Sequence, residues 1–237
     1  MSFEAVLNDK RRILASYQKM TDQGAVLAIA AAAPAGTLSE FHAGTVRVGL
    51  RHDMDSDVEN AVRMAEWEHA HGLRSTYFAL HTDWYYRHGG EFTPLLLASL
   101  ERIASLGHEI GLHNNAMSAA RSIGLDAQRV LRYELAMLRA HFDVRGTAAH
   151  GDAYNHECGA ISFELFDECV REGNADRVTH APLSFFDLDY EAYHLGYDEY
   201  LSDNGGKWND DPARVCAAVL EGRSCVVLQH PLHWRVP

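Results

Sequence analysis

Apolar runs of four to six residues recur along the chain, separated by segments with a helical pattern. Val46, Val48 and Leu50 alternate with other residues, which predicts a strand, and similar runs predict strands at residues 75–80, 108–113, 145–150, 197–201 and 225–230. Apolar residues spaced three and four apart predict helices at residues 57–71, 94–106, 126–141, 160–170 and 211–221. Strands that alternate with helices are typical of a parallel sheet with crossover connections. We therefore expect an α/β fold with about seven parallel strands in a barrel-like sheet.

The first 44 residues differ from this alternation. An apolar stripe predicts a helix over residues 2–20, whereas residues 24–44 show no clear period. Within them, residues 25–33 are apolar but too few to span a bilayer, and we interpret them as a buried strand or short helix. We expect a single domain over residues 1–237, with a helical N-terminal extension at about 1–44.

Helix starts are marked by capping patterns. Ser56 with Glu59 three residues later has the form of a capping box, which predicts a helix start after the first strand. Thr93 followed by Pro94, and Asp211 followed by Pro212, predict two further starts.

The composition is that of an ordinary globular protein. Of the 237 residues, 47% are hydrophobic and 23% are charged, and the formal net charge of −12 argues against a nucleic-acid or anionic-membrane partner. The four cysteines form no Cys-x-x-Cys motif and no signal peptide precedes them, so we expect reduced thiols in a cytoplasmic protein without a membrane span.

Polar residues recur where the predicted strands end. Asp53 and Asp55 lie between the first strand and its helix, and His113, His150 and His230 each end a later apolar run. In a parallel barrel these ends share one face. One carboxylate and two imidazoles commonly hold zinc with positions left for water and substrate. The pattern therefore predicts a divalent metal site, most simply for zinc, at the carboxyl ends of the strands.

Three segments resemble the polysaccharide deacetylase superfamily, also called the NodB-homology or carbohydrate esterase family 4 superfamily. They are Leu50-Arg-His-Asp-Met-Asp55, Gly107-His-Glu-Ile-Gly-Leu-His113 and Leu228-Gln-His230, and the resemblance covers about residues 46–230. The first segment is similar to a divergent branch with the form Arg-His-Asp-x-Asp. The resemblance implies a distorted, incomplete (β/α) barrel and metal-dependent hydrolysis of acetyl groups on sugars.

The resemblance also implies roles for individual residues. Asp53 matches the general base, Asp55 the metal-binding carboxylate, His113 the first metal-binding histidine and His230 the general acid. The segment from Tyr200 through Asp203 to Trp208 is similar to one that lines the sugar pocket. The expected substrate is a small carbohydrate or glycan precursor.

The sequence departs from the family pattern at the metal site. The usual second histidine lies four residues after the first, where this chain has Met117, and the usual Arg-Pro-Pro-Tyr segment is replaced by Ala148-Ala-His150-Gly-Asp152. We predict that His150 supplies the missing imidazole. In the alternative, His150 hydrogen-bonds Asp53 in place of the family's arginine. Five other histidines, His52, His69, His71, His81 and His88, are interpreted as surface or loop-packing residues.

Rival functions remain open at this point. With an altered triad, the protein could be a catalytically degenerate sugar-binding or regulatory protein on the deacetylase scaffold. A glycosyltransferase also uses Asp-x-Asp to hold a metal and a nucleotide diphosphate, but it would not need His113 and His230. A dehalogenase-type phosphatase has an apolar approach to its nucleophile, where this chain has Arg51 and His52.

Overall fold

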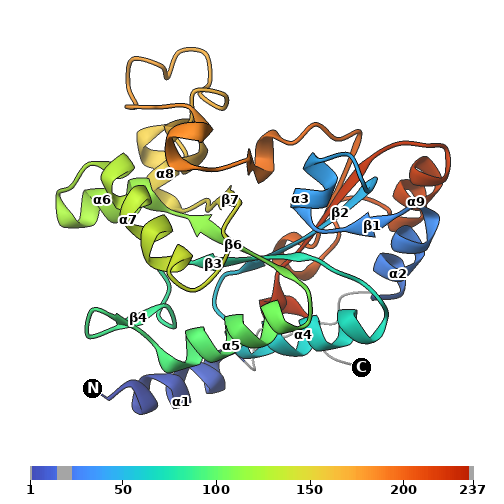
Figure 1. Cartoon of the computed structure of the whole chain (residues 1–237), viewed down its shortest axis with the longest axis horizontal. Helices are drawn as coiled ribbons and strands as arrows, with labels where there is room; N and C mark the ends of the chain where they lie inside the picture. The colour runs from blue at the N-terminus through green and yellow to red at the C-terminus, as the bar shows by residue number, and fades with distance from the viewer. Residues whose placement is uncertain (1, 15–22, 235–237) are drawn as a thin grey trace. The chain divides into compact units, whose positions relative to one another are not determined.

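The computed structural model describes residues 2–14 and 23–234 (Figure 1). The described chain divides into two compact units. Of the described residues, the first unit comprises 2–14, 23–77, 83–109 and 197–234, and the second comprises 78–82 and 110–196.

The strands follow the order β8-β7-β6-β3-β2-β10-β9, and β1 pairs with β2. Their bounds are β1 Ala35–Gly36, β2 Val48–Met54, β3 Thr76–Leu80, β6 Glu109–Asn114, β7 Gly146–Ala149, β8 Tyr190–Glu191, β9 Glu199–Ser202 and β10 Cys225–Gln229. A separate hairpin pairs β4 (Arg87–His88) with β5 (Glu91–Phe92). Helices alternate with the strands of the seven-strand path, which makes the fold the predicted distorted, incomplete (β/α) barrel.

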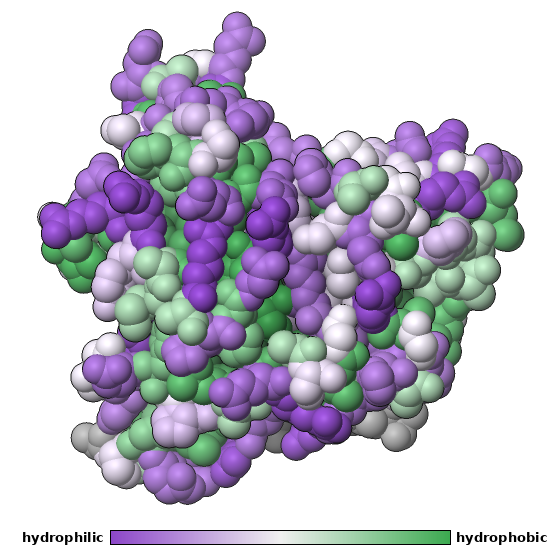
Figure 2. Space-filling view, viewed as in Figure 1, coloured by the Kyte–Doolittle hydropathy of each residue, from purple (hydrophilic) through white to green (hydrophobic). Residues whose placement is uncertain are grey.

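In the first unit, β2 is the central strand. It is buried along its whole length. β10 pairs with it in parallel from Val48 to His52, and β1 pairs with it at Val48 and Gly49. Val48 and Leu50 of β2, with Val227 of β10, face a hydrophobic cluster against α2 (Gln23–Ala32) and α9 (Pro212–Leu220). The two helices lie side by side (Figure 1). Figure 2 shows hydrophobic surface along the right edge, where α2 and α9 lie.

The other helices of the first unit follow their capping residues. They are α1 Phe3–Leu14, α3 Leu38–His42, α4 Val58–Ala70 and α5 Pro94–Ser105. Thr93 caps α5 by accepting from the backbone N–H of Leu96, and Asp211 caps α9 in the same way through Ala213. Both predicted starts are thereby confirmed.

The second unit carries β6, β7 and β8 with helices around them. These helices are α6 Ala116–Ile123, α7 Ala127–Arg139 and α8 Ala153–Cys158. The strands pair in parallel, with His113 opposite Ala148 and Gly146 opposite Tyr190. The Tyr190 ring occupies the space that a side chain at Gly146 would need. Only glycine therefore allows these two strands to approach at this point.

Three sequence-based predictions are wrong in detail. The capping box does not form: the N-cap of α4 is Asp57, and the Ser56 hydroxyl donates to Asp83 instead. The strand β2 continues through Asp53 rather than ending before it. The helix predicted at residues 160–170 is absent, and only a 3₁₀ turn at Ser162–Leu165 forms there.

The first 44 residues contain helices, as expected. The structure places α1, α2 and α3 there, so residues 25–32 of the apolar run are helical rather than extended. Residues 15–20 of the predicted first helix lie outside the described residues. No helix in the described ranges is long and apolar enough to cross a membrane.

Candidate functional site

An arginine and an aspartate form a buried ion pair within β2. The Arg51 Nε atom donates to Asp53 Oδ1 at 2.8 Å, and Arg51 Nη2 donates to Oδ2 at 2.7 Å. Neither side chain is more than 2% exposed. Residues two apart in a strand point to the same side, which brings the two together. The bidentate contact fixes the carboxylate in one orientation.

Arg51 has no role in the predicted site. Its spacing from Asp53 in an alternating strand is nevertheless the pattern that reveals the pair, because side chains two residues apart share a face. The family's arginine was expected to be lost or replaced by His150. In this chain a guanidinium from the same strand engages both oxygens of Asp53.

His230 follows the end of β10, next to the end of β2. Gln229 of β10 pairs in register with His52 of β2, so His230 comes one residue beyond the paired positions. Its Nε2 atom lies 3.9 Å from Asp55 Oδ2. In the first unit the structure thus brings together Asp55 and His230, which the sequence predicted at strand ends.

Asp203 holds His230 in place. Its Oδ1 atom lies 2.7 Å from His230 Nδ1, and both carboxylate oxygens accept from the His230 backbone N–H at 3.0 Å. Asp203 is fully buried. The contact leaves His230 Nε2 directed toward Asp55.

The surroundings of His230 favour its charged form. Burial lowers the pKa of the His230 imidazole. The hydrogen bond to Asp203 and the charges of Asp53 and Asp55 outweigh this effect and raise that pKa to about 9. At neutral pH the imidazole therefore carries a proton that it can donate.

In the second unit, two imidazoles face each other. His113 Nδ1 lies 2.8 Å from the Ala148 carbonyl oxygen, to which it can only donate, and in the neutral imidazole this leaves the lone pair on His113 Nε2. That Nε2 atom lies 3.1 Å from His150 Nδ1. Two nitrogen ligands of a tetrahedral zinc ion are about 3.3 Å apart, from bond lengths of about 2.0–2.1 Å. The pair has the separation of two ligands of one ion.

The donor chemistry at this pair fits a metal. Histidine ligands usually donate their other ring N–H to a backbone carbonyl or carboxylate, as His113 does to Ala148. The His150 backbone is held on both sides, because its N–H donates to Asn114 and its carbonyl accepts from Asn155 Nδ2. A metal could replace the proton that the two rings share.

Met117 stands at the position of the second histidine, but its thioether offers no nitrogen ligand to a metal. It lies in the first turn of α6 and is half-buried.

A carboxylate lies near His150. Asn115 Nδ2 donates to Asp152 Oδ2 at 3.0 Å and to Thr82 at 3.2 Å. Burial raises the pKa of Asp152, but its hydrogen bonds and the charge of His150 lower it overall. Asp152 is thus a charged neighbour of His150.

The two predicted substrate residues have different surroundings. Asp203 contacts His230, as described above, whereas Trp208 is half-buried and packs against the hydrophobic cluster under α2 and α9. Contact of either residue with a sugar stays a prediction.

Two histidines assigned to loops or surface are buried. His52 Nε2 lies 2.7 Å from Glu68 Oε1, and Glu68 also accepts from Ser75 and Tyr77. His81 Nε2 accepts from the backbone N–H of Asn115 at 2.9 Å. The prediction is wrong for His52, which is a buried residue of β2, because strand packing encloses it. His81 follows β3 in a loop and packs there, which agrees with its interpretation as a loop-packing residue.

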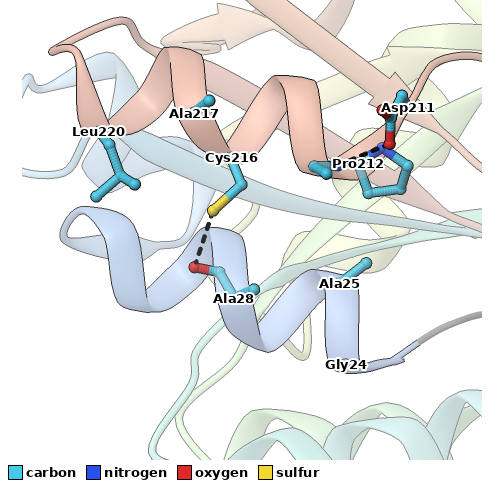
Figure 3. A pocket seen from close by; sticks show the side chains of 9 residues that line it. Gly24, Ala25, Ala28, Asp211, Pro212, Cys216, Ala217 and Leu220 are labelled. Atoms are coloured by element: carbon cyan, nitrogen blue, oxygen red, sulfur yellow. Dashed lines mark hydrogen bonds between the residues drawn. The ribbon is translucent and has the colours of Figure 1, made fainter.

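A hollow between α2 and α9 lacks a cluster of ionisable side chains like the one at the strand ends (Figure 3). Most residues around it are small or apolar, and the Cys216 thiol donates to the Ala28 carbonyl oxygen at 3.6 Å. Its one carboxylate, on Asp211, already caps α9. The ionisable groups suited to catalysis lie at the strand ends instead.

Comparison with solved structures finds two chains that match. One of them is the crystal structure of a mutant of BA3943, described as a CE4 family pseudoenzyme with restored enzymatic activity. The sequences are 16% identical, and the match covers 78% of this chain and 56% of that chain with a TM-score of 0.40. This chain thus spans little more than half the length of that one. No protein-family model matches the sequence, and neither does any curated protein.

Proposed function

We propose that this protein is a metal-dependent hydrolase that removes an acetyl or similar acyl group from an amino sugar or glycan precursor. The observation that carries the proposal is an acid–base pair at two neighbouring strand ends. Asp53 is a carboxylate held by Arg51, and His230 is an imidazole held in its charged form beside Asp55. Hydrolysis of an amide or ester needs such a base and such an acid.

Asp53 acts as the base in this proposal. It takes a proton from the attacking water, while Arg51 keeps the carboxylate in one orientation. His230 acts as the acid and gives its Nε2 proton to the departing amine or alcohol. Asp203 keeps that imidazole charged and correctly turned. A positioned acid or base typically contributes about a hundredfold to ten-thousandfold in rate.

The metal ligands in this proposal are Asp55, His113 and His150. The lone pair on His113 Nε2 and its 3.1 Å separation from His150 Nδ1 support the two imidazoles. Asp55 is inferred as the carboxylate from its place two residues after the base. When bound, a zinc-like ion polarises the acyl carbonyl and lowers the pKa of a water molecule. Asp203 and Trp208 are kept as proposed sugar contacts.

Metal content and turnover test the proposal together. The purified protein is loaded with zinc, dialysed and analysed for bound metal, and acetate release is measured on a panel of N-acetylated and O-acetylated sugars. Asp53→Asn should keep the metal and lose at least about a hundredfold in rate. Asp176→Asn, at an exposed position, is the matched control and should keep full activity. Full turnover by Asp53→Asn would remove Asp53 from the role of base.

The third ligand is tested by zinc titration. His150→Ala should weaken zinc binding strongly, whereas His71→Ala, at an exposed position, should not. Unchanged affinity in His150→Ala would exclude His150 as a ligand.

Met117, where the family has its second histidine, favours one alternative function. A catalytically degenerate sugar-binding protein would bind sugars with no acetate release from any of the panel. A DxD glycosyltransferase would instead require a nucleotide sugar for metal-dependent activity.

A further inference from the structure

A second group of metal-binding side chains lies in the second unit, apart from the proposed ligands. Cys169, Glu191 and His194 place a thiol, a carboxylate and an imidazole with their ligand atoms all within 4.8 Å of one another. We propose that these three residues bind a zinc-like divalent ion that stabilises the surrounding loops. This proposal does not rest on the proposed hydrolase function.

Glu191 provides a fixed carboxylate at the centre of the group. It is buried at the end of β8, and its Oε1 accepts from the Ala149 backbone N–H at 2.8 Å. Its Oε2 accepts from the Tyr193 backbone N–H at 2.7 Å. The orientation of this ligand is therefore set before an ion arrives.

Cys169 and His194 approach this carboxylate from different segments. Cys169 is buried in the loop after the 3₁₀ turn, whereas His194 is exposed at the end of a short 3₁₀ turn, Ala192–His194. The Phe163 ring packs edge-to-face against the His194 ring, with 5.0 Å between centroids. The group thus has two buried ligands and one at the surface, through which an ion can enter.

The charges at the group favour a cation. The Cys169 thiol lies beside the Glu191 carboxylate, which carries a negative charge into this buried place. A divalent ion would bind Cys169 as a thiolate, with the thiol proton released to water, and would neutralise the thiolate and the carboxylate together. Thiolate, imidazole and carboxylate together are a ligand set that zinc accepts.

The segment around the group has little regular structure, and an ion could stabilise it by joining its parts. Between Cys158 and Tyr190 the described chain has only two 3₁₀ turns, Ser162–Leu165 and Leu183–Phe186. An ion at this group would join the loop at Cys169 to β8 and to the following turn. Glu191 also holds Ala149, the residue before His150. The ion would therefore stabilise both the long irregular segment and the end of β7.

Cobalt titration of the full-length protein tests this site specifically. Co²⁺ bound to a thiolate gives a charge-transfer absorption in the near ultraviolet, which imidazole and carboxylate ligands alone do not give. The wild-type protein should show this absorption, and Cys169→Ser should lose it. Cys216→Ser is the matched control, because Cys216 donates to a helix carbonyl away from the group, and it should retain the band.

An exposed ligand gives a second variant that spares the fold. His194→Ala should weaken Co²⁺ binding at least tenfold, since even loss of a residue that only supports a metal ligand typically costs that much. The double variant His113→Ala/His150→Ala should keep the charge-transfer band, which separates this site from the one proposed for hydrolysis. A wild-type protein without the band, or a band that survives in Cys169→Ser, would overturn the proposal.

Discussion

Replacing Arg51 by methionine removes the guanidinium from a buried carboxylate. Arg51 and Asp53 are joined by two hydrogen bonds of 2.8 and 2.7 Å, and both side chains are enclosed. Removing one partner of a buried ion pair typically costs about 3–5 kcal/mol, because the other charge stays buried without that partner. For a chain of this size, each kcal/mol lowers Tm by about 2–4 °C. Arg51→Met should therefore lower Tm by about 6–20 °C.

An exposed ion pair provides the matched control. Arg12 Nη2 lies 2.8 Å from Asp9, with side chains 81% and 55% exposed. Such pairs contribute about 0–1 kcal/mol, so Arg12→Met should change stability little. The double variant Arg51→Met/Asp53→Asn removes both charges and should be more stable than Arg51→Met alone. Urea unfolding monitored by circular dichroism measures all four proteins.

The pH dependence of unfolding stability provides an independent test of the buried pair. In Arg51→Met the folded state favours a protonated Asp53, whereas the unfolded state releases that proton above about pH 4. The folded state then binds more protons, so the stability of the variant relative to wild type should rise as pH falls from 7 to 5. A loss of stability equal to that of Arg12→Met, or a relative stability that falls with pH, would refute the buried pair.

Two further predictions concern other buried charges. The raised His230 pKa contributes stability that is complete below about pH 6.5 and is lost as pH rises through about 9. Asp203→Asn should lower that pKa in the metal-free protein, as measured by NMR titration of the imidazole. An unchanged His230 titration would contradict the contact with Asp203. Burial raises the pKa of Glu164, but hydrogen bonds from Arg171 and its neighbours lower it overall to about 2. The stabilisation from the charged Glu164 is present above about pH 4.3 and is lost as pH falls toward 2. Glu164→Gln should therefore lower the free energy of unfolding in urea by about 1–3 kcal/mol at pH 7, and it should reduce the loss of stability at acid pH. Equal losses at pH 3 and pH 7 would contradict the prediction.

The regular elements of the barrel could be predicted from local pattern. Strands β2, β3, β6, β7 and β10 follow their apolar runs, and α5 and α9 start at the predicted capping residues. These features are local because a strand or helix shows its period over a few residues, and an N-cap binds a backbone N–H two or three positions away. The strand ends that carry the candidate site residues were predictable for the same reason.

In one segment, the spacing of apolar residues predicted a helix that does not form. Residues 160–170 have a helical spacing of apolar residues, yet Glu164 in their middle is buried and bonded to Arg171 and Asn174. Phe166 instead forms an isolated bridge with Ala181. Contacts with residues up to fifteen positions away therefore outweigh the weak intrinsic preference for a helix.

The sequence by itself determined which ionisable residues stand at the strand ends, because side-chain period and strand limits are properties of a few consecutive residues. Only the tertiary structure decided their partners. Asp203 reaches His230 across 27 positions, and Glu191 reaches the backbone of Ala149 across 42. Such contacts depend on strand register and loop paths, which no local window of sequence specifies. The charge state of His230 is decided in the same way, since its pKa is set by the carboxylates that the fold gathers around it.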